Sequence, residues 1–135
     1  MYGLADSPVG LAAYLLDHDA ASLAHISELF VEGRPFGDLT RDDILDNITL
    51  TWLTNTAVSS ARLYWENKGG FFTVKGVKVP VAVSVFPEEI YQAPQSWAQR
   101  AYPMLIHYNK LPKGGHFAAW EQPTLLSSEM RTGFS

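Results

Sequence analysis

The chain has 135 residues, the length of one ordinary domain, and its composition of 47% hydrophobic and 18% charged residues excludes a disordered chain. Ten Lys and Arg residues against fourteen Asp and Glu residues give a net charge of -4 without a basic tract, so nucleic acid is not an expected partner. The absence of cysteine excludes disulfides, thiolate metal sites and cysteine nucleophiles. No apolar stretch has the length of a membrane span and the first residues lack a signal-peptide pattern, so we expect a cytoplasmic protein.

Helical signals dominate the first half of the chain. Ser7 followed by Pro8 is a typical N-cap with proline in the first turn, and apolar residues at helical spacing then predict a helix over about 8–17. A weaker helical pattern covers about 20–30 and ends before a loop that contains Gly33. We therefore expect two short helices here.

A longer helical pattern begins after Thr40. Asp42 and Asp43 follow this cap, and acidic residues in a first turn stabilise a helix through its dipole. The apolar periodicity then continues to Asn67. Its length allows a break near residues 54–56.

The pattern changes to alternating strands and helices in the second half of the chain. Residues 71–74 are expected to be extended, and the β-branched run over 79–86 predicts a strand buried on both faces, as in a parallel sheet. Residues 94–101 predict a helix and 104–108 a second strand. The connection has the length that a parallel crossover needs, which indicates a β-α-β unit.

These patterns predict an α/β fold in two parts. The first part, residues 1–68, is a helical segment, and the second, residues 69–135, holds the parallel strands and a final helix capped by Thr124. The strand over 81–86 leaves an edge that nothing in this sequence covers, so we also expect self-association or poor solubility.

Two loops that follow the predicted strands carry groups suited to acid–base chemistry. Glu88 and Glu89 follow the first strand, and His116 follows the second, after Gly114 and Gly115. The carboxyl ends of parallel strands meet at one sheet edge, so a carboxylate can orient the imidazole and stabilise its protonated form. Acid followed by histidine is also the order of α/β-hydrolases. Either loop alone is typical of a solvated surface, but together they predict a catalytic pair.

The remaining histidines do not form a metal-binding pattern. Neither HExxH nor HxH occurs, and His107 lies inside the second predicted strand. We therefore expect neither a metal nor another cofactor.

Four segments of the sequence resemble a known family, the epoxide hydrolases of microsomal type within the α/β-hydrolase superfamily. They are DSPVGLAAY over 6–14, SSARLYWEN over 59–67, FPEE over 86–89 and GGHFAA over 114–119. The resemblance implies the carboxyl-terminal part of that fold: late cap helices, then the last strands and helices of the core. It implies hydrolysis of a small-molecule epoxide to a diol through a covalent ester, and a role in detoxification.

The same resemblance implies site residues. In the family, the FPxE glutamate and the GGHFAA histidine complete the catalytic triad, and they match Glu89 and His116 here, with Glu88 as the competing acid. Tyr64 matches one of two cap tyrosines that donate a proton to the opened epoxide oxygen. Without this match, Tyr64 reads as a residue that packs on a helix face.

The chain also departs from the family pattern. The family's aspartate nucleophile stands on a strand-to-helix turn of the Gly-x-Asp-x-Gly type, which has no match here, and Gly-x-Ser-x-Gly does not occur either. The oxyanion loop and the second cap tyrosine are also unmatched. We therefore expect the isolated chain to be inactive. A serine-type ester hydrolase of the same fold and a non-catalytic remnant are the alternatives.

Overall fold

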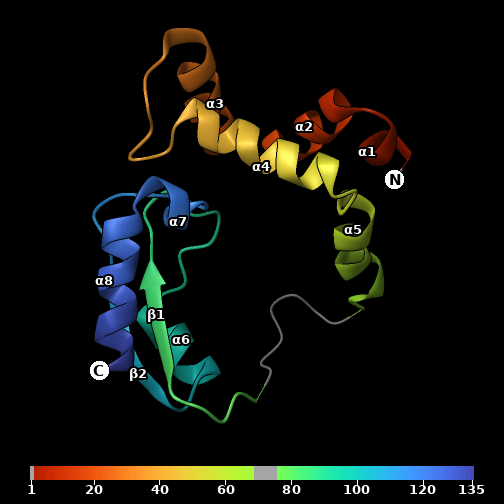
Figure 1. Cartoon of the computed structure of the whole chain (residues 1–135). Coiled ribbons are helices and arrows are strands. Elements are labelled where there is room, and N and C mark those ends of the chain that lie inside the picture. The colour runs from red at the N-terminus through yellow and green to blue at the C-terminus, as the bar shows by residue number, and fades with distance from the viewer. Residues whose placement is uncertain (1, 69–75) are drawn as a thin grey trace. The chain divides into compact units, whose positions relative to one another are not determined.

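A computed structural model of the protein describes residues 2–68 and 76–135 (Figure 1). These residues form two compact units that divide at about residue 70. The fold is mixed α/β, with two parallel strands and many helices, as the sequence predicts. The extended segment expected over 71–74 lies outside the described residues.

The first unit is helical. Its elements are α1 (Tyr2–Asp6), α2 (Pro8–Leu16), α3 (Ala20–Glu32), α4 (Arg41–Leu53) and α5 (Ala57–Glu66). The sequence does not predict α1, because its five residues precede the first capping signal. The long pattern after Thr40 is two helices: α4 ends at Leu53 and the chain turns through Asn55, whose φ is 52°.

Side-chain caps fix where these helices begin. Ser7 Oγ accepts the Gly10 N–H over 3.1 Å at the start of α2, and Thr40 forms a reciprocal capping box with Asp43 at the start of α4. Asp19 caps α3. Burial acts to raise the pKa of the Asp19 carboxyl, but hydrogen bonds from the His18 side chain and from the residues that open α3 lower it well below its usual range.

The core of the first unit lies between α2, α3 and α4. Its buried residues come from the second half of α3, the loop before α4 and one face of α4: Leu29, Leu39, Ile44 and Ile48. Half-buried apolar residues of α2 and α3 pack against them. Burial of this apolar surface is the main term that holds the short helices together.

The second unit contains the sheet. Its elements are β1 (Val81–Val85), α6 (Gln95–Ala101), β2 (Leu105–Lys110), α7 (Ala118–Glu121) and α8 (Pro123–Phe134). β1 and β2 pair in parallel, with Val83 opposite Tyr108 and Ser84 opposite Asn109. The predicted β-α-β unit is therefore confirmed, with α6 as its crossover helix (Figure 1).

Two expectations about this unit are wrong. β1 is not buried on both faces: Val85 is its only buried residue. Within residues 2–68 and 76–135, β2 is the one strand that pairs with it, and a sheet of two strands leaves most of each strand partly uncovered. The last helix begins at Pro123 with Gln122 before it, not after a Thr124 cap. Proline suits a first helical position because its missing N–H has no partner there, and this signal outweighs the threonine one residue later.

A polar network fastens α8 to the sheet. The Glu129 carboxylate accepts hydrogen bonds from Ser84 Oγ at 2.9 Å, His107 Nε2 at 2.8 Å and Asn109 Nδ2 at 2.8 Å. The hydrogen bond with His107 is the largest of the contributions that lower the pKa of Glu129, and it outweighs the opposing effect of burial. One carboxylate thus joins β1, β2 and α8.

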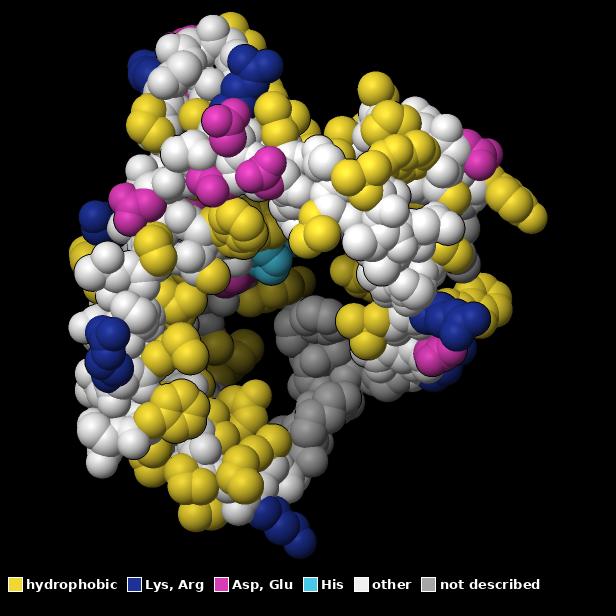
Figure 2. Space-filling view, in the orientation of Figure 1, with side chains coloured by type: hydrophobic (Ala, Val, Ile, Leu, Met, Phe, Trp, Pro, Cys, Tyr) yellow, Lys and Arg dark blue, Asp and Glu magenta, His cyan; other side chains and the backbone are white. Residues whose placement is uncertain are grey.

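Apolar packing completes the second unit at the carboxyl ends of the strands. Phe86, Leu111 and Ala118 are buried there, and Leu125 and Leu126 of α8 pack against them. Elsewhere this unit exposes large apolar side chains, among them Trp97 and Ile106, and Figure 2 shows hydrophobic side chains gathered over α6 and β2. Among the described residues, no helix combines the length and the apolar character that crossing a membrane requires.

Candidate active site

Two loops lie side by side at the carboxyl ends of β1 and β2. The Leu111 N–H donates to the Val85 carbonyl over 2.8 Å, and the Glu88 N–H donates to the Gly114 carbonyl over 3.2 Å. Glu88 and Gly115 also form a parallel β-bridge. The strand pairing therefore extends into the loops and holds the predicted acid and histidine segments together.

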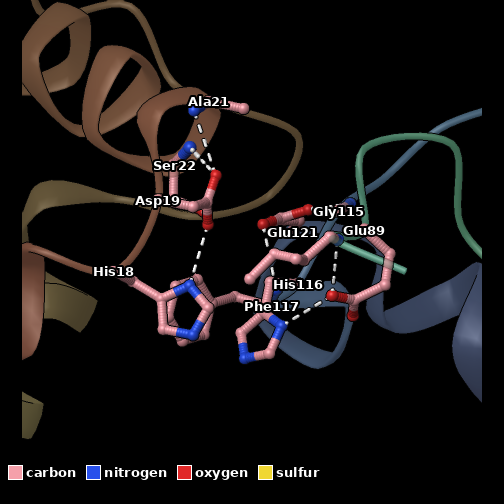
Figure 3. A network of polar contacts seen from close by, with 10 residues as sticks. His18, Asp19, Ala21, Ser22, Glu89, Gly115, His116, Phe117 and Glu121 are labelled. Carbon is pink, nitrogen blue, oxygen red and sulfur yellow. Dashed lines mark hydrogen bonds and ion pairs between the residues drawn. The ribbon is translucent and has the colours of Figure 1, made fainter.

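Glu89 and His116 meet between these loops. His116 Nδ1 lies 2.9 Å from Glu89 Oε1, and Figure 3 shows the two side chains pointing toward one another. A carboxylate can only accept, so Nδ1 carries the proton, and in the neutral ring Nε2 is the nitrogen that can take up another. Both side chains are about one-third exposed. The chemistry that this arrangement allows is proton transfer at Nε2, with the ring oriented through Nδ1 and open to solvent.

The backbone of the acid loop holds the Glu89 carboxylate in place. The Ile90 N–H donates to Glu89 Oε1 over 2.8 Å, and the Glu89 N–H closes a turn onto the Phe86 carbonyl over 3.3 Å. The same carboxylate oxygen therefore accepts from both Ile90 and His116. Glu88, the competing acid in the sequence, contributes its backbone to the contact between the loops.

Glycine at position 114 is required twice over. Its φ of 102° is strained for any residue with a side chain, and a Cβ there would lie 2.9 Å from Phe86 Cδ1 and 3.0 Å from Gln122 Cγ. The tight turn before His116 thus depends on a residue without a side chain.

Glu121 is a residue of this site that the sequence does not single out. It is 3% exposed, and its carboxylate accepts the Gly115 N–H over 2.6 Å and the Phe117 N–H over 3.2 Å. One signal in the sequence could have identified it: Glu121 is the charged residue at the end of the otherwise apolar helix α7. A carboxylate in such a buried position needs hydrogen-bond partners, which points to a structural role.

The described residues offer no alternative metal centre. No group of three or more His, Asp or Glu side chains within 2–68 and 76–135 is arranged to hold a metal ion.

Comparison with known proteins identifies relatives for nearly the whole chain. No family model matches it. It is 41% identical over 132 residues to Epoxide hydrolase 1 of Oryctolagus cuniculus, and 47% identical over 133 residues to a Stigmatella aurantiaca protein whose name assigns it provisionally to the epoxide hydrolases. These matches cover 94% and 98% of this chain. The chain is homologous to the epoxide hydrolases.

A solved structure supports the same relationship. The juvenile hormone epoxide hydrolase of the silkworm Bombyx mori matches with a TM-score of 0.75 and 30% identity over 98% of this chain and 35% of that one. The matched region is the carboxyl-terminal part of the epoxide hydrolase fold, as the four sequence segments predict. The chain spans about 29% of the length of the Oryctolagus cuniculus and Stigmatella aurantiaca relatives.

The structure brings together two of the three residues that the resemblance to epoxide hydrolases implies, Glu89 and His116. The third, Tyr64, belongs to the first unit, where it is 74% exposed on α5. It lines an open depression of about 420 Å³ together with Tyr14, Ala61 and residues of α1 and α2. Its part in chemistry with Glu89 and His116 stays a prediction.

Proposed function

We propose that this chain supplies the acid–histidine half of an epoxide hydrolase active site, in which His116 acts as general base and Glu89 orients it. The hydrogen bond of 2.9 Å between Glu89 and His116, at the ends of two paired parallel strands, is the observation that carries this proposal. Homology to epoxide hydrolases over nearly the whole chain supports it.

The proposed reaction has two steps. A carboxylate nucleophile attacks an epoxide carbon, the C–O bond breaks, and the product is a covalent ester whose alkoxide takes a proton from an acidic hydroxyl. His116 Nε2 then accepts a proton from water as the water attacks the ester carbonyl. The tetrahedral intermediate then breaks its bond to the diol oxygen, that oxygen takes the proton back from the His116 imidazolium, and the diol leaves. The carboxyl group loses its remaining proton, which restores the phenol through solvent, so the carboxylate nucleophile is regenerated.

Glu89 and Tyr64 have separate parts in this scheme. Glu89 holds the His116 ring with Nδ1 protonated, and its negative charge stabilises the imidazolium that forms when Nε2 accepts a proton. Tyr64 is the proposed proton donor to the alkoxide: its neutral phenol gives up the proton and remains a phenolate until a proton returns in the second step.

The nucleophile has no match in this sequence, which lacks the glycine-flanked turn on which the family carries it. We propose that the isolated chain is inactive on epoxides for this reason, and that it acts when the rest of the fold completes it. The substrate class is a small-molecule epoxide, and detoxification is the role that this chemistry suits.

A chimaera tests the proposal. This chain would replace the matching 132-residue segment of rabbit Epoxide hydrolase 1, and diol formation from a small epoxide would be measured. The chimaera is expected to form diol, and its His116→Gln and Glu89→Gln variants to be strongly impaired. A folded chimaera whose His116→Gln variant forms diol at an unchanged rate would reject the role of His116.

The two alternative functions predict other results. A serine-type ester hydrolase needs no tyrosine to open an epoxide, so under this alternative Tyr64→Phe would leave the rate of the chimaera unchanged. The names of the relatives reported above favour an epoxide hydrolase over this alternative. A non-catalytic remnant would leave a folded chimaera without diol formation.

A further inference from the structure

The buried carboxylate of Glu121 holds the backbone on both sides of His116. Its Oε2 accepts the Gly115 N–H over 2.6 Å and its Oε1 accepts the Phe117 N–H over 3.2 Å, as Figure 3 shows. These are the amides of the residues directly before and after His116. The Phe117 hydrogen bond fixes the peptide plane between His116 and Phe117, and the Gly115 hydrogen bond fixes the plane between Gly114 and Gly115. Together they restrain the backbone on both sides of His116 and so limit the direction of its side chain.

Both oxygens of this carboxylate are in use, and both accept. Hydrogen bonds from N–H groups to a charged oxygen are about twice as strong as neutral ones, and a buried site strengthens them further. An amide side chain at position 121 would present one oxygen and one NH₂ group, and the NH₂ group cannot accept from a backbone N–H. A glutamine could therefore satisfy only one of the two flanking amides.

The loop has little other freedom to place His116. Gly115 packs closely, since a Cβ there would lie 3.2 Å from the Glu88 Cβ and 3.4 Å from Glu121 Oε2. Glu88 in turn pairs with the glycine turn through its backbone N–H. Glu121, at the end of α7, thus binds the histidine loop from one side. Glu88 binds the same loop from the segment that follows β1 and carries Glu89.

We propose that Glu121 is a positioning residue for His116: by binding the Gly115 and Phe117 amides, it keeps the imidazole within hydrogen-bond reach of Glu89. The catalytic meaning of this role rests on the proposed function. The positioning itself can be measured on the chain without any turnover, so the two can fail separately.

The experiment compares the full chain with its Glu121→Gln variant by long-range ¹H–¹⁵N NMR of the His116 ring. The unmodified chain is expected to show a single Nδ1-protonated tautomer held by Glu89. The variant is expected to lose that tautomer preference and to resemble Glu89→Gln. Glu129→Gln is the matched control, because it removes a carboxylate of the same unit that bonds the sheet and not this loop.

An unchanged His116 tautomer in a folded Glu121→Gln variant would overturn the proposal. Equal loss in Glu129→Gln would overturn it too, since a general loosening of the unit would then explain the effect. If Glu121→Gln fails to fold, amide hydrogen exchange on the unmodified chain tests the same two hydrogen bonds. Gly115 and Phe117 amides are expected to exchange at least about tenfold more slowly than other loop amides, and equal rates would contradict the proposal.

Discussion

The backbone N–H of Glu88 donates to the carbonyl of Gly114 over 3.2 Å, so the loop that carries the acid and the loop that carries the histidine are joined through their main chains. Side chains alone would let the Glu89–His116 distance vary with rotamer, but paired backbones fix the starting points of both side chains. The precision of the candidate pair therefore depends on the turn at Gly114.

Gly114→Ala is predicted to destabilise the second unit. The new methyl group would meet Phe86 and Gln122 at 3.0 Å or less while the backbone keeps a φ of 102°. Strain of these two kinds costs about 2–4 kcal/mol, which urea unfolding would measure. Gly76→Ala is the control, since Gly76 also has a positive φ but nothing within 4 Å, and its cost should be about 1 kcal/mol. Equal effects at the two positions would contradict the packing argument.

Glu129→Gln is predicted to weaken the attachment of α8 in a pH-dependent way. The pKa of Glu129 is lowered in the folded protein, so its charge stabilises the fold above the unfolded pKa of about 4.3, and this contribution disappears as pH falls through the lower folded value. Unfolding at about pH 6 should show a loss of about 2 kcal/mol relative to the unmodified chain. The loss should shrink as the pH falls below about 4. An offset that stays constant from neutral to acid pH would contradict this account.

Gly133→Ala is predicted to push α8 away from β1. A Cβ at position 133 would lie 2.8 Å from the Ala82 Cβ, closer than two such atoms can approach. Overpacking of this kind costs about 1–3 kcal/mol, and Ala82→Gly should recover most of it in the double variant. A double-mutant cycle by urea unfolding measures the coupling. Additive effects would show that α8 accommodates the methyl group without moving from Ala82.

Self-association of the isolated chain is also predicted. Among the described residues, β1 pairs only with β2, so its other edge offers backbone N–H and C=O groups to a second chain. Exposed apolar side chains near the sheet, such as Val79 and Ile106, favour the same outcome. Size-exclusion chromatography at tens of micromolar should give a larger or concentration-dependent species. A sharp monomer peak across that range would contradict the prediction.

The features that the sequence predicts well are set by neighbouring residues. Ser7 and Thr40 cap helices through contacts only three residues away, so their signals are complete in the local sequence. The β-α-β crossover is likewise specified by strand length and connection length. The meeting of Glu89 and His116 then follows, because parallel strands bring successive loops to one edge.

The features that the sequence does not predict depend on tertiary contacts. The role of Glu121 depends on the Gly115 and Phe117 amides, which point toward it only in the folded turn. The burial of β1 depends on how many strands and helices cover the sheet. The start of α8 has two neighbouring signals in the sequence: Pro123, which suits a first helical position, and Thr124, which suits an N-cap. The sequence alone does not decide between them. The short helices α1 and α7 lack the repeated periodicity that identifies a helix.

Trapping of the covalent ester tests the central claim most directly. In the chimaera with rabbit Epoxide hydrolase 1, His116→Gln leaves ring opening intact but removes the base that activates water, so mass spectrometry after a single turnover should find the substrate bound covalently to the protein. The chimaera with His116 present should release diol without accumulating the adduct. Diol release by the His116→Gln variant at an unchanged rate, with no adduct, would contradict the account.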